Sequence, residues 1–379
     1  MNRAGEYRKN LCGELMYKSF VPNPLPPKPE LSFDETFSNL LAKAKSAIAK
    51  LNAISTRLPS VPLFVSMYVR KEALLSSQIE GTQATLDDIL APNLEENTNQ
   101  NVAEVINYIK ATDFAKKRLE TLPLCNRLLL ETHGVLMQDI RGGEKYPGEF
   151  RRSQNWLGSR GSSIKTARYI PPNPEDMTQA MSDLEKYINA VDQTDPLIKI
   201  ALVHYQFETI HPFLDGNGRI GRLMINLFLK ENALLSLPTL YISCFLKRNR
   251  IEYYDRLTAV REKGDFEQWV KFFLQAVFES AQDAIESIDR LTELHEKNTK
   301  IIQENITRTK SVLRIFNYLE NTPIIDIKKT AVELNLAYNT VSNAVKKLEE
   351  LGIIKQVGEA RRSRTFAYEE YLSVLRKDT

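Results

Sequence analysis

The chain has 379 residues, a formal net charge of +3 and 42% hydrophobic residues. This composition is ordinary for a soluble globular protein, and it excludes a mainly disordered or a fibrous chain. A net charge this small does not by itself indicate a nucleic acid or membrane partner. The cysteines Cys12, Cys125 and Cys244 are widely spaced, so we expect free thiols in a reducing compartment.

The N-terminus and the apolar stretches bear on location. The first ten residues, MNRAGEYRKN, contain no apolar segment of a secretory signal. No stretch reaches the roughly 18 uninterrupted apolar residues that a membrane span requires. We therefore expect a cytoplasmic protein without a membrane partner.

Apolar residues at three- and four-residue spacing predict helices along most of the chain. A proline-rich arm, VPNPLPPKP at 21–29, precedes them. The expected helices cover residues 33–54, 65–79, a short segment from 85, 102–122, 126–138, 177–191, 196–210, a run after Gly218, and 266–304. Residues 91–101 predict a surface loop. Glycines and prolines in 141–175 predict loops and a short hairpin near 155–170.

Residues 211–222 read HPFLDGNGRIGR and carry the strongest chemical signal. A glycine-rich turn that leads into a helix exposes backbone N–H groups and forms an anion-binding nest. Arg219 and Arg222 add positive charge on one helix face. Asp215 suits Mg²⁺ against phosphate oxygens, and His211 suits a base near neutral pH. The combination indicates phosphoryl or nucleotidyl transfer.

Two other interpretations of this segment stay open from the residues. A calcium loop would place Phe213 and Met224 at ligand positions, where neither side chain can bind a cation. The second interpretation is that the segment is a tight turn between two helices and that its charged residues lie on the surface. On the predicted helix 196–210, the four-residue spacing of His204 and Glu208 indicates a packed helix face rather than a metal site. We expect His133 and His295 to have structural or surface roles.

The segment HPFLDGNGRIGR resembles the Fic family signature HPFx[D/E]GNGRxxR at every defined position. The similarity extends over about residues 20–280, with PGEFR at 147–151, QNW at 154–156, IPPNP at 170–174 and EYY at 252–254. The resemblance implies a mainly all-α fold, with a helical core and a small β-hairpin flap. It also implies transfer of AMP from ATP to a Ser, Thr or Tyr hydroxyl of a target protein or of the chain itself.

The resemblance also implies roles for individual residues. His211 would deprotonate the target hydroxyl, and Asp215 would hold Mg²⁺ on the α- and β-phosphates. The ATP-binding residues would be Asp215, Gly216, Asn217, Gly218, Arg219, Arg222, Tyr253 and Tyr254, the two tyrosines on the adenine side. A flap at 162–168 would bind the target segment through Ser163, Ile164, Lys165 and Thr166.

Residues 76–81 read SSQIEG and resemble the Fic inhibitory motif [S/T]xxxE[G/N]. Ser76 and Glu80 are four residues apart and share one face of a helix at about 65–81. By this resemblance Glu80 would pair with Arg222 and keep ATP from binding productively. The alternative is a surface glutamate at a helix end, where it opposes the helix dipole. The family also links this glutamate to removal of AMP.

The C-terminal segment, 306–379, differs in charge from the rest, with 13 Lys and Arg against 9 Asp and Glu. Three predicted helices and a hairpin at 355–368, with Gly358, Arg361, Arg362 and Arg364 near its tip, resemble a winged helix-turn-helix. The expected recognition helix begins near Tyr338 and carries Ser342, Asn343, Lys346 and Lys347. Contact with DNA and contact with protein, including a homodimer, both stay open.

Together these features predict four parts: an N-terminal arm and helical region at 1–125, a Fic catalytic domain at 126–275, a connecting helix at 276–305, and a winged helix-turn-helix domain at 306–379. The predicted function is a Mg²⁺-dependent protein adenylyltransferase that uses ATP and is inhibited by Glu80. The alternatives are an enzyme that removes AMP and a DNA-binding regulator with a nucleotide-sensing Fic core.

Overall fold

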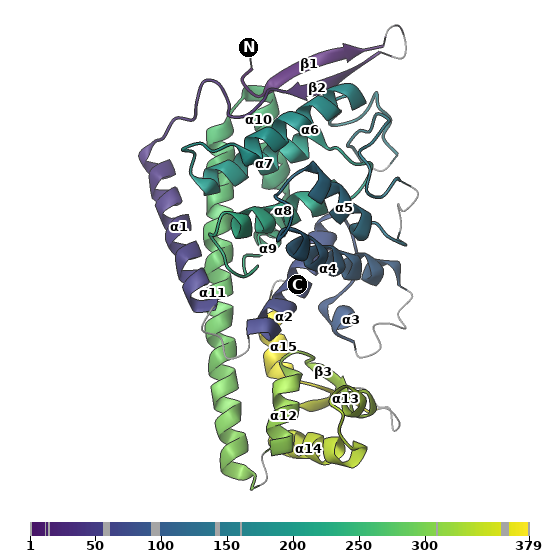
Figure 1. Ribbon diagram of the computed structural model, residues 1–379, viewed down its shortest axis with the longest axis vertical. Helices are drawn as coiled ribbons and strands as arrows, with labels where there is room; N and C mark the ends of the chain where they lie inside the picture. Colours follow the sequence, from purple (N-terminus) through teal and green to yellow (C-terminus); the bar gives the residue numbers. More distant parts are fainter. Residues whose placement is uncertain are drawn as a thin grey trace.

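The computed structural model describes residues 2–11, 13, 16–55, 61–91, 99–140, 145–159, 161–307, 310–357 and 364–377. Helices dominate these residues, and the described strands form two small antiparallel sheets, which confirms the mainly all-α prediction (Figure 1). None of the helices in this part of the chain combines the length and the apolar character of a membrane span.

An N-terminal hairpin precedes the helices and was not predicted. Strands β1 (Gly5–Asn10) and β2 (Tyr17–Pro22) pair antiparallel, with Gly5 opposite Pro22. The buried Phe20 donates its backbone N–H to the carbonyl oxygen of Ile170 at 2.9 Å. The hairpin therefore lies beside the segment that follows the predicted flap. Charged residues fill the exposed side of β1, so no alternating apolar pattern marks it in the sequence.

The helices before residue 140 begin and end close to the predicted positions. They are α1 (Glu35–Ser55), α2 (Val61–Ile79), α3 (Leu86–Leu90), α4 (Gln100–Arg118) and α5 (Asn126–Leu136). A capping box between Thr85 and Asp88 starts α3. Of the loop predicted at 91–101, residues 92–98 lie outside the described part, and the end of the segment already belongs to α4.

The helices α6 (Pro174–Asn189), α7 (Pro196–Ile210) and α8 (Asn217–Glu231) form the centre of the molecule. Asp195 caps α7 by accepting from the Leu197 N–H, and all residues from Leu197 to Ile210 are buried. A helix that is buried on every side needs other elements around its whole circumference. The short connection from α7 to α8 holds the predicted catalytic segment, which is therefore enclosed by the core.

A 40-residue helix, α11 (Phe266–Asn305), runs through the molecule after α9 (Ser243–Arg248) and α10 (Arg250–Lys263). Asp265 caps its first turn through the Gln268 N–H. At 1.5 Å per residue it is about 60 Å long. Its first part packs against α1, α7, α9 and α10, and its second part carries the C-terminal domain (Figure 1).

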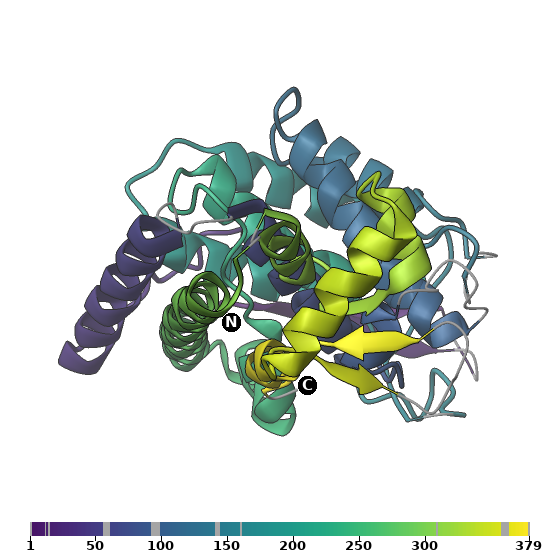
Figure 2. The ribbon, with the colours of Figure 1, turned by 90° about the horizontal axis from the view of Figure 1, so that it is seen from below.

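The C-terminal domain is a winged helix-turn-helix, as predicted (Figure 2). It consists of α12 (Lys310–Leu319), β3 (Ile324–Asp326), α13 (Ile327–Glu333), α14 (Tyr338–Glu350), β4 (Lys355–Val357), β5 (Thr365–Ala367) and α15 (Glu369–Leu375). The strand order is β3-β5-β4. Gly358, Arg361 and Arg362 at the predicted wing tip lie outside the described residues.

Polar contacts fasten this domain to the long helix. Asn298 of α11 donates to the hydroxyl of Tyr368 at 2.6 Å, and His295 lies 2.7 Å from Glu320. The hydrogen bond to Glu320 raises the pKa of His295, so this contact favours the protonated ring. His295 is thus a structural residue in the contact between α11 and the end of α12.

The hairpin predicted near 155–170 is smaller than expected. Leu157 and Tyr169 form a single antiparallel bridge, with N–H to carbonyl distances of 2.8 and 3.1 Å in the two directions. Between them, the Ser163 N–H bonds to the Thr166 hydroxyl and closes a turn. This local bond replaces ladder pairing, because Ser and Thr side chains compete with the backbone for partners.

The two tryptophans give a test of the core. Trp269 is completely buried and donates its indole N–H to the Ala201 carbonyl of α7 at 2.8 Å. Trp269→Phe should lower the free energy of unfolding by about 2 kcal/mol, because it leaves a small cavity and an unpaired carbonyl. Urea denaturation measures this change.

Trp156→Phe is the matched control, since Trp156 is 42% exposed. Its substitution should change stability by less than about 0.5 kcal/mol. Equal effects of the two substitutions would contradict the placement of Trp269 in the core.

Candidate active site

His211 ends α7 in a left-handed backbone conformation, with φ of 50°. Arg151 holds it there by donating from Nε to the His211 carbonyl oxygen at 3.0 Å. The imidazole Nδ1 is buried and makes no hydrogen bond with any described residue. Burial and, after it, the nearby Arg151 guanidinium lower the pKa of His211 to about 4. The ring is therefore neutral at physiological pH and available as a base.

The loop after His211 is closed by its own side chain amide. Asn217 accepts from the Phe213 N–H and donates to the Phe213 carbonyl, both at 2.8 Å. Gly216 then starts α8 without a side-chain cap, so the N–H groups of the first turn of α8 have no partner within the helix. With the helix dipole, these groups form a cradle for an anion.

Arg219 lies in the first turn of α8 and is only 5% exposed. Its Nε and Nη1 make no hydrogen bond with the described residues. Its Nη2 is 3.5 Å from the sulfur of Met137 and 3.6 Å from Oδ1 of Asp215. A buried guanidinium with unsatisfied donors is costly unless an anion binds it, so this side chain points to a phosphate beside the cradle.

Asp215 precedes the cradle and has a half-exposed carboxylate. Lys145 donates to Oδ2 at 2.9 Å, and Arg219 lies near Oδ1. Burial raises the pKa of Asp215, but these two cations outweigh it and hold the pKa below its usual value. In the described part of the chain, no three His, Cys, Asp or Glu side chains gather as a metal site. A single carboxylate beside a phosphate cradle does fit Mg²⁺, which takes substrate phosphates as its further ligands.

The structure brings Ser76, Glu80 and Arg222 together. Oε1 of Glu80 is 2.7 Å from Nη2 of Arg222. Ser76 accepts from the same guanidinium twice, through its hydroxyl at 2.8 Å and its carbonyl at 2.9 Å. Arg222 is 1% exposed; burial lowers its pKa, but Glu80 and its neighbours raise the pKa above the usual value. The guanidinium is therefore always charged, and Glu80 is its carboxylate partner.

His133 also belongs to the site, although its position in the sequence gave no indication of this. Its ring stacks on Phe213 with centroids 3.8 Å apart. Nδ1 accepts from the Gly148 N–H at 2.9 Å, so Nε2 carries the proton and donates to the Asp215 carbonyl at 3.1 Å. His133 thus supports the loop from α5, 82 residues earlier in the chain. The contact of Lys145 with Asp215 was not predicted either, because the two residues are 70 positions apart in the chain.

A hollow of about 630 Å³ lies between the flap segment and α10. Its lining includes Leu157, Thr166, Arg168, Glu208, Tyr254 and Arg261. Tyr254 thus reaches the hollow. Tyr253 is 1% exposed and lies behind it, where its hydroxyl bonds to Nε2 of His204 at 3.0 Å. His204 is fully buried, as predicted for a packed helix face.

The four predicted flap residues differ in their exposure and in whether they line this hollow. Ser163, Lys165 and Thr166 are exposed, and Ile164 is partly buried. Among these four residues, Thr166 lines the hollow. They form an open turn rather than an extended strand, so the described conformation has no strand edge ready for a target segment.

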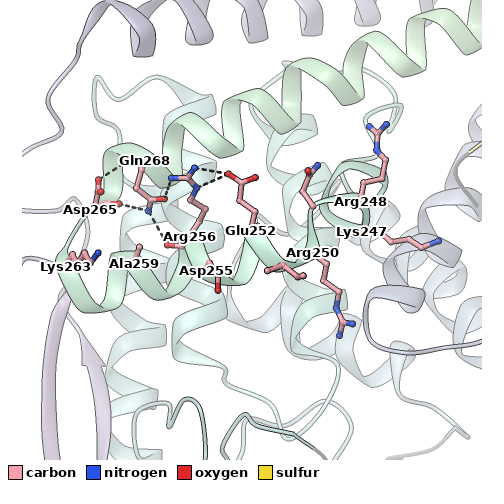
Figure 3. A pocket seen from close by; sticks show the side chains of 12 residues that line it. Lys247, Arg248, Arg250, Glu252, Asp255, Arg256, Ala259, Lys263, Asp265 and Gln268 are labelled. Atoms are coloured by element: carbon pink, nitrogen blue, oxygen red, sulfur yellow. Dashed lines mark hydrogen bonds and ion pairs between the residues drawn. The ribbon is translucent and has the colours of Figure 1, made fainter.

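A second hollow lies on the other side of α10, beside Arg250 and Ile251 (Figure 3). Arg256 crosses it and bonds to Glu252 at 2.8 Å and to Gln268 at 3.1 Å. Its lining contains no residue of the segment 211–222. The hollow beside the flap lacks these residues too, but its lining includes Glu208, whose Oε1 lies against Gly221 of α8, so it is the hollow linked to the candidate catalytic segment.

Three family models match the chain. The Fic/DOC family matches residues 123–229, the Fic/DOC family N-terminal model matches residues 38–117, and a winged helix-turn-helix DNA-binding model matches residues 308–355. The first of these contains His211 and the cradle. The second contains Ser76 and Glu80.

Named relatives agree with these models. The chain is 34% identical over 180 residues to a protein adenylyltransferase Fic of Culex quinquefasciatus, covering 47% of the chain and 32% of the relative. It is 30% identical over 228 residues to the protein of that name in Drosophila melanogaster, covering 55% and 43%. The chain thus spans less than half the length of these relatives.

Solved structures share the fold. A Fic family protein from Desulfovibrio desulfuricans superimposes with a TM-score of 0.57 and 19% identity, over 89% of this chain and 97% of that one. Fic-1 from C. elegans gives a TM-score of 0.50 and 22% identity, over 67% and 73%. These likenesses show a shared fold. The Fic/DOC family models over residues 38–117 and 123–229, with the named relatives, show that the chain belongs to the Fic/DOC family and carries a winged helix-turn-helix domain at residues 308–355.

Proposed function

We propose that this chain is a protein adenylyltransferase, which transfers AMP from ATP to a Ser, Thr or Tyr hydroxyl of a target protein or of itself. The buried, unsatisfied guanidinium of Arg219 beside the N-terminus of α8 is the observation that carries this proposal. A phosphate group bound there would satisfy the Arg219 donors and would lie in the same loop as the neutral His211. The names of the relatives support the same reaction.

His211 acts as the general base in this proposal. It takes the proton of the target hydroxyl, whose oxygen attacks the α-phosphorus of ATP. The bond from the α-phosphorus to the oxygen that bridges to the β-phosphate breaks, and pyrophosphate leaves. A positioned base of this kind contributes typically about 10²–10⁴-fold to the rate.

The α8 cradle, Arg219 and Asp215 position the phosphates. Backbone N–H groups of the first turn, Gly218 among them, stabilise the charge that builds on the α-phosphate. Asp215 would hold Mg²⁺, and the ion, when bound, neutralises charge on the phosphate oxygens. Lys145, which now bonds to Asp215, would have to give up part of that contact.

Glu80 acts as an inhibitor in this proposal. It holds the Arg222 guanidinium that the outer phosphates of ATP require, and its Oε1 lies where a side chain at Gly218 would be. Its carboxylate therefore adds negative charge at the entrance to the cradle. Both effects weaken binding of the outer phosphates. Removal of AMP by the same site is the alternative direction.

The winged helix-turn-helix domain is proposed to bind duplex DNA. Tyr338, Asn339, Asn343 and Lys346 are exposed on α14, the second helix of the helix-turn-helix. A regulator that only senses nucleotide is the second candidate function for the whole chain. A regulator of this kind has no use for the neutral, buried imidazole of His211, which favours the enzyme.

The first prediction concerns the Glu80 inhibitor. Glu80→Gly frees Arg222 and should raise self-modification by AMP at least about tenfold, because a charge-assisted pair is lost. Mass spectrometry of the intact protein after incubation with ATP and Mg²⁺ measures the added AMP.

The control is Glu80→Gly combined with His211→Ala, which should abolish the added mass while ATP binding survives. Modification that persists without His211 would refute its role as base. Absence of added mass in every variant would refute self-modification and leave two options, an obligatory external target or a donor other than ATP; other nucleotides and an AMP-modified substrate would then be tested.

The low pKa of His211 predicts the pH profile. Its base form is populated down to about pH 4. The rate of self-modification of Glu80→Gly at saturating ATP should therefore be level between about pH 6 and pH 8. A rate that climbs through pH 6–7, as for an exposed histidine near 6.5, would contradict the buried neutral imidazole.

DNA binding by the C-terminal domain is tested with a fluorescent duplex. Anisotropy should report binding that weakens steeply as salt rises. Lys346→Glu on α14 should reduce it by about tenfold or more, because it reverses one charge at the DNA surface. Lys300→Glu on α11 makes the same charge change away from α14 and should have little effect. Absence of binding at low salt would leave protein contact as the role of this domain.

A further inference from the structure

Glu208 is a buried carboxyl group for which the proposed reaction provides no role. It lies on α7, three residues before His211, and is 9% exposed. Its Oε1 is fully shielded and makes no hydrogen bond with any described residue. A buried carboxyl without a partner destabilises the folded protein, so such groups are kept where a ligand supplies the missing bond.

The neighbours of Glu208 do not satisfy it. Burial raises its pKa to about 7, and the attraction of Arg222 offsets this only in part, because Arg222 is already paired with Glu80. Arg261 exerts a smaller attraction; its guanidinium lies over the Tyr169 ring at 4.1 Å and donates to Thr258. These neighbours act on the carboxyl group through charge and not through a hydrogen bond. Oε1 is enclosed against α8, and Glu208 as a whole reaches the lining of the hollow.

Two glycines of α8, Gly218 and Gly221, leave room for the carboxyl groups of Glu80 and Glu208. A Cβ at Gly221 would collide with Oε1 of Glu208, just as one at Gly218 would collide with Oε1 of Glu80. The two carboxyl groups thus lie over successive turns of α8, about 5 Å apart along its axis. Glu80 lies at the cradle, and Glu208 lies one turn further along the helix.

Glu208 also lines the hollow of about 630 Å³ beside the flap. Tyr254 and Leu257 give this hollow an aromatic and an apolar wall. Three arginines and three serine or threonine side chains also line it, namely Arg168, Arg250, Arg261, Ser159, Thr166 and Thr258. A concave site with an aromatic wall and a few polar groups is typical of a small-molecule site, and Glu208 is the one carboxyl group among the described residues of this lining. Glu208 links this hollow to α8 at Gly221, one turn beyond the cradle, so the nucleoside of a nucleotide bound at the cradle would extend toward it.

We propose that Glu208 accepts a hydrogen bond from the nucleoside half of the nucleotide, and so determines which nucleotides this site accepts. The inference rests on the proposed function, because it takes ATP as the ligand of the cradle. Two kinds of donor share the required chemistry, the ribose hydroxyls and the exocyclic amine of the base. A carboxylate also repels acceptor groups, so nucleotides with a carbonyl in place of the amine would bind less well.

The test measures nucleotide binding by calorimetry in Glu80→Gly, with and without Glu208→Gln. The ligands are ATP and three analogues that each lack one donor. The analogue 2′-deoxy-ATP lacks the 2′-hydroxyl, 3′-deoxy-ATP lacks the 3′-hydroxyl, and inosine triphosphate lacks the exocyclic amine. At pH 8.5, where Glu208 with its pKa of about 7 is mostly ionised, Glu208→Gln should weaken ATP binding by roughly tenfold, the usual loss for a hydrogen bond to a charged group. The analogue that lacks the donor should bind Glu80→Gly more weakly and be insensitive to Glu208→Gln.

A structural role for Glu208 predicts a different pattern. Loss of the same factor for all four ligands, or no loss for ATP, would overturn the inference while leaving the proposed function intact. If Glu80→Gly binds none of the nucleotides, the proposed function fails and the inference fails with it.

Thermal unfolding without nucleotide gives a second readout. Glu208→Gln should unfold at the same or a higher temperature, because it removes an unpaired buried acid. Glu72→Gln is the matched control: Glu72 is also buried and its pKa is also raised to about 7, chiefly by burial, but it accepts from the Ser243 hydroxyl and N–H. This control should lower the unfolding temperature and leave the preference among the four nucleotides unchanged. A lower unfolding temperature for Glu208→Gln, without a change in preference, would assign it a packing role.

Discussion

The burial of the Arg222 guanidinium is the constraint on which the rest of this site depends. Helix α8 packs against α2, α4 and α7, so its side chains have almost no access to water. Removing a cation from water costs several kcal/mol unless hydrogen bonds and an opposite charge offset the loss. Ser76 and Glu80 supply both, and this requirement fixes the end of α2 against α8.

Three buried arginines near the site are satisfied in different ways. Arg151 donates to backbone carbonyl groups of the surrounding loops, including those of His211 and Ser153, which suits a structural role. Arg222 is paired with the carboxylate of Glu80, which can move away. Arg219 keeps unsatisfied donors among the described residues. The kind of partner, rather than the charge itself, therefore distinguishes a residue that holds the loop from residues suited to bind a ligand.

The sequence was informative where a feature is contained in one segment. The helices α7 and α8, the loop between them and the long α11 follow from apolar spacing, capping and glycine positions. Features made by distant segments left no such pattern. His133 and Lys145 reach the loop from elsewhere in the chain, and the β1–β2 hairpin has no alternating apolar residues. The predicted flap hairpin is reduced to one bridge because Ser163 and Thr166 bond locally instead.

The position of Glu80 just past the last residue of α2 has a consequence for how inhibition would operate. Most of the helix before it is core, including Ala73, Leu74 and Leu75, which are fully buried, so the helix cannot move out as a body. Glu80 itself has a side chain that is 37% exposed and is followed by Gly81 in a left-handed conformation. Rotation about its own side-chain bonds, a motion of picoseconds to nanoseconds, is enough to separate it from Arg222. Inhibition of this kind is a rapid equilibrium, and its strength depends on the concentration of the anion that competes with Glu80.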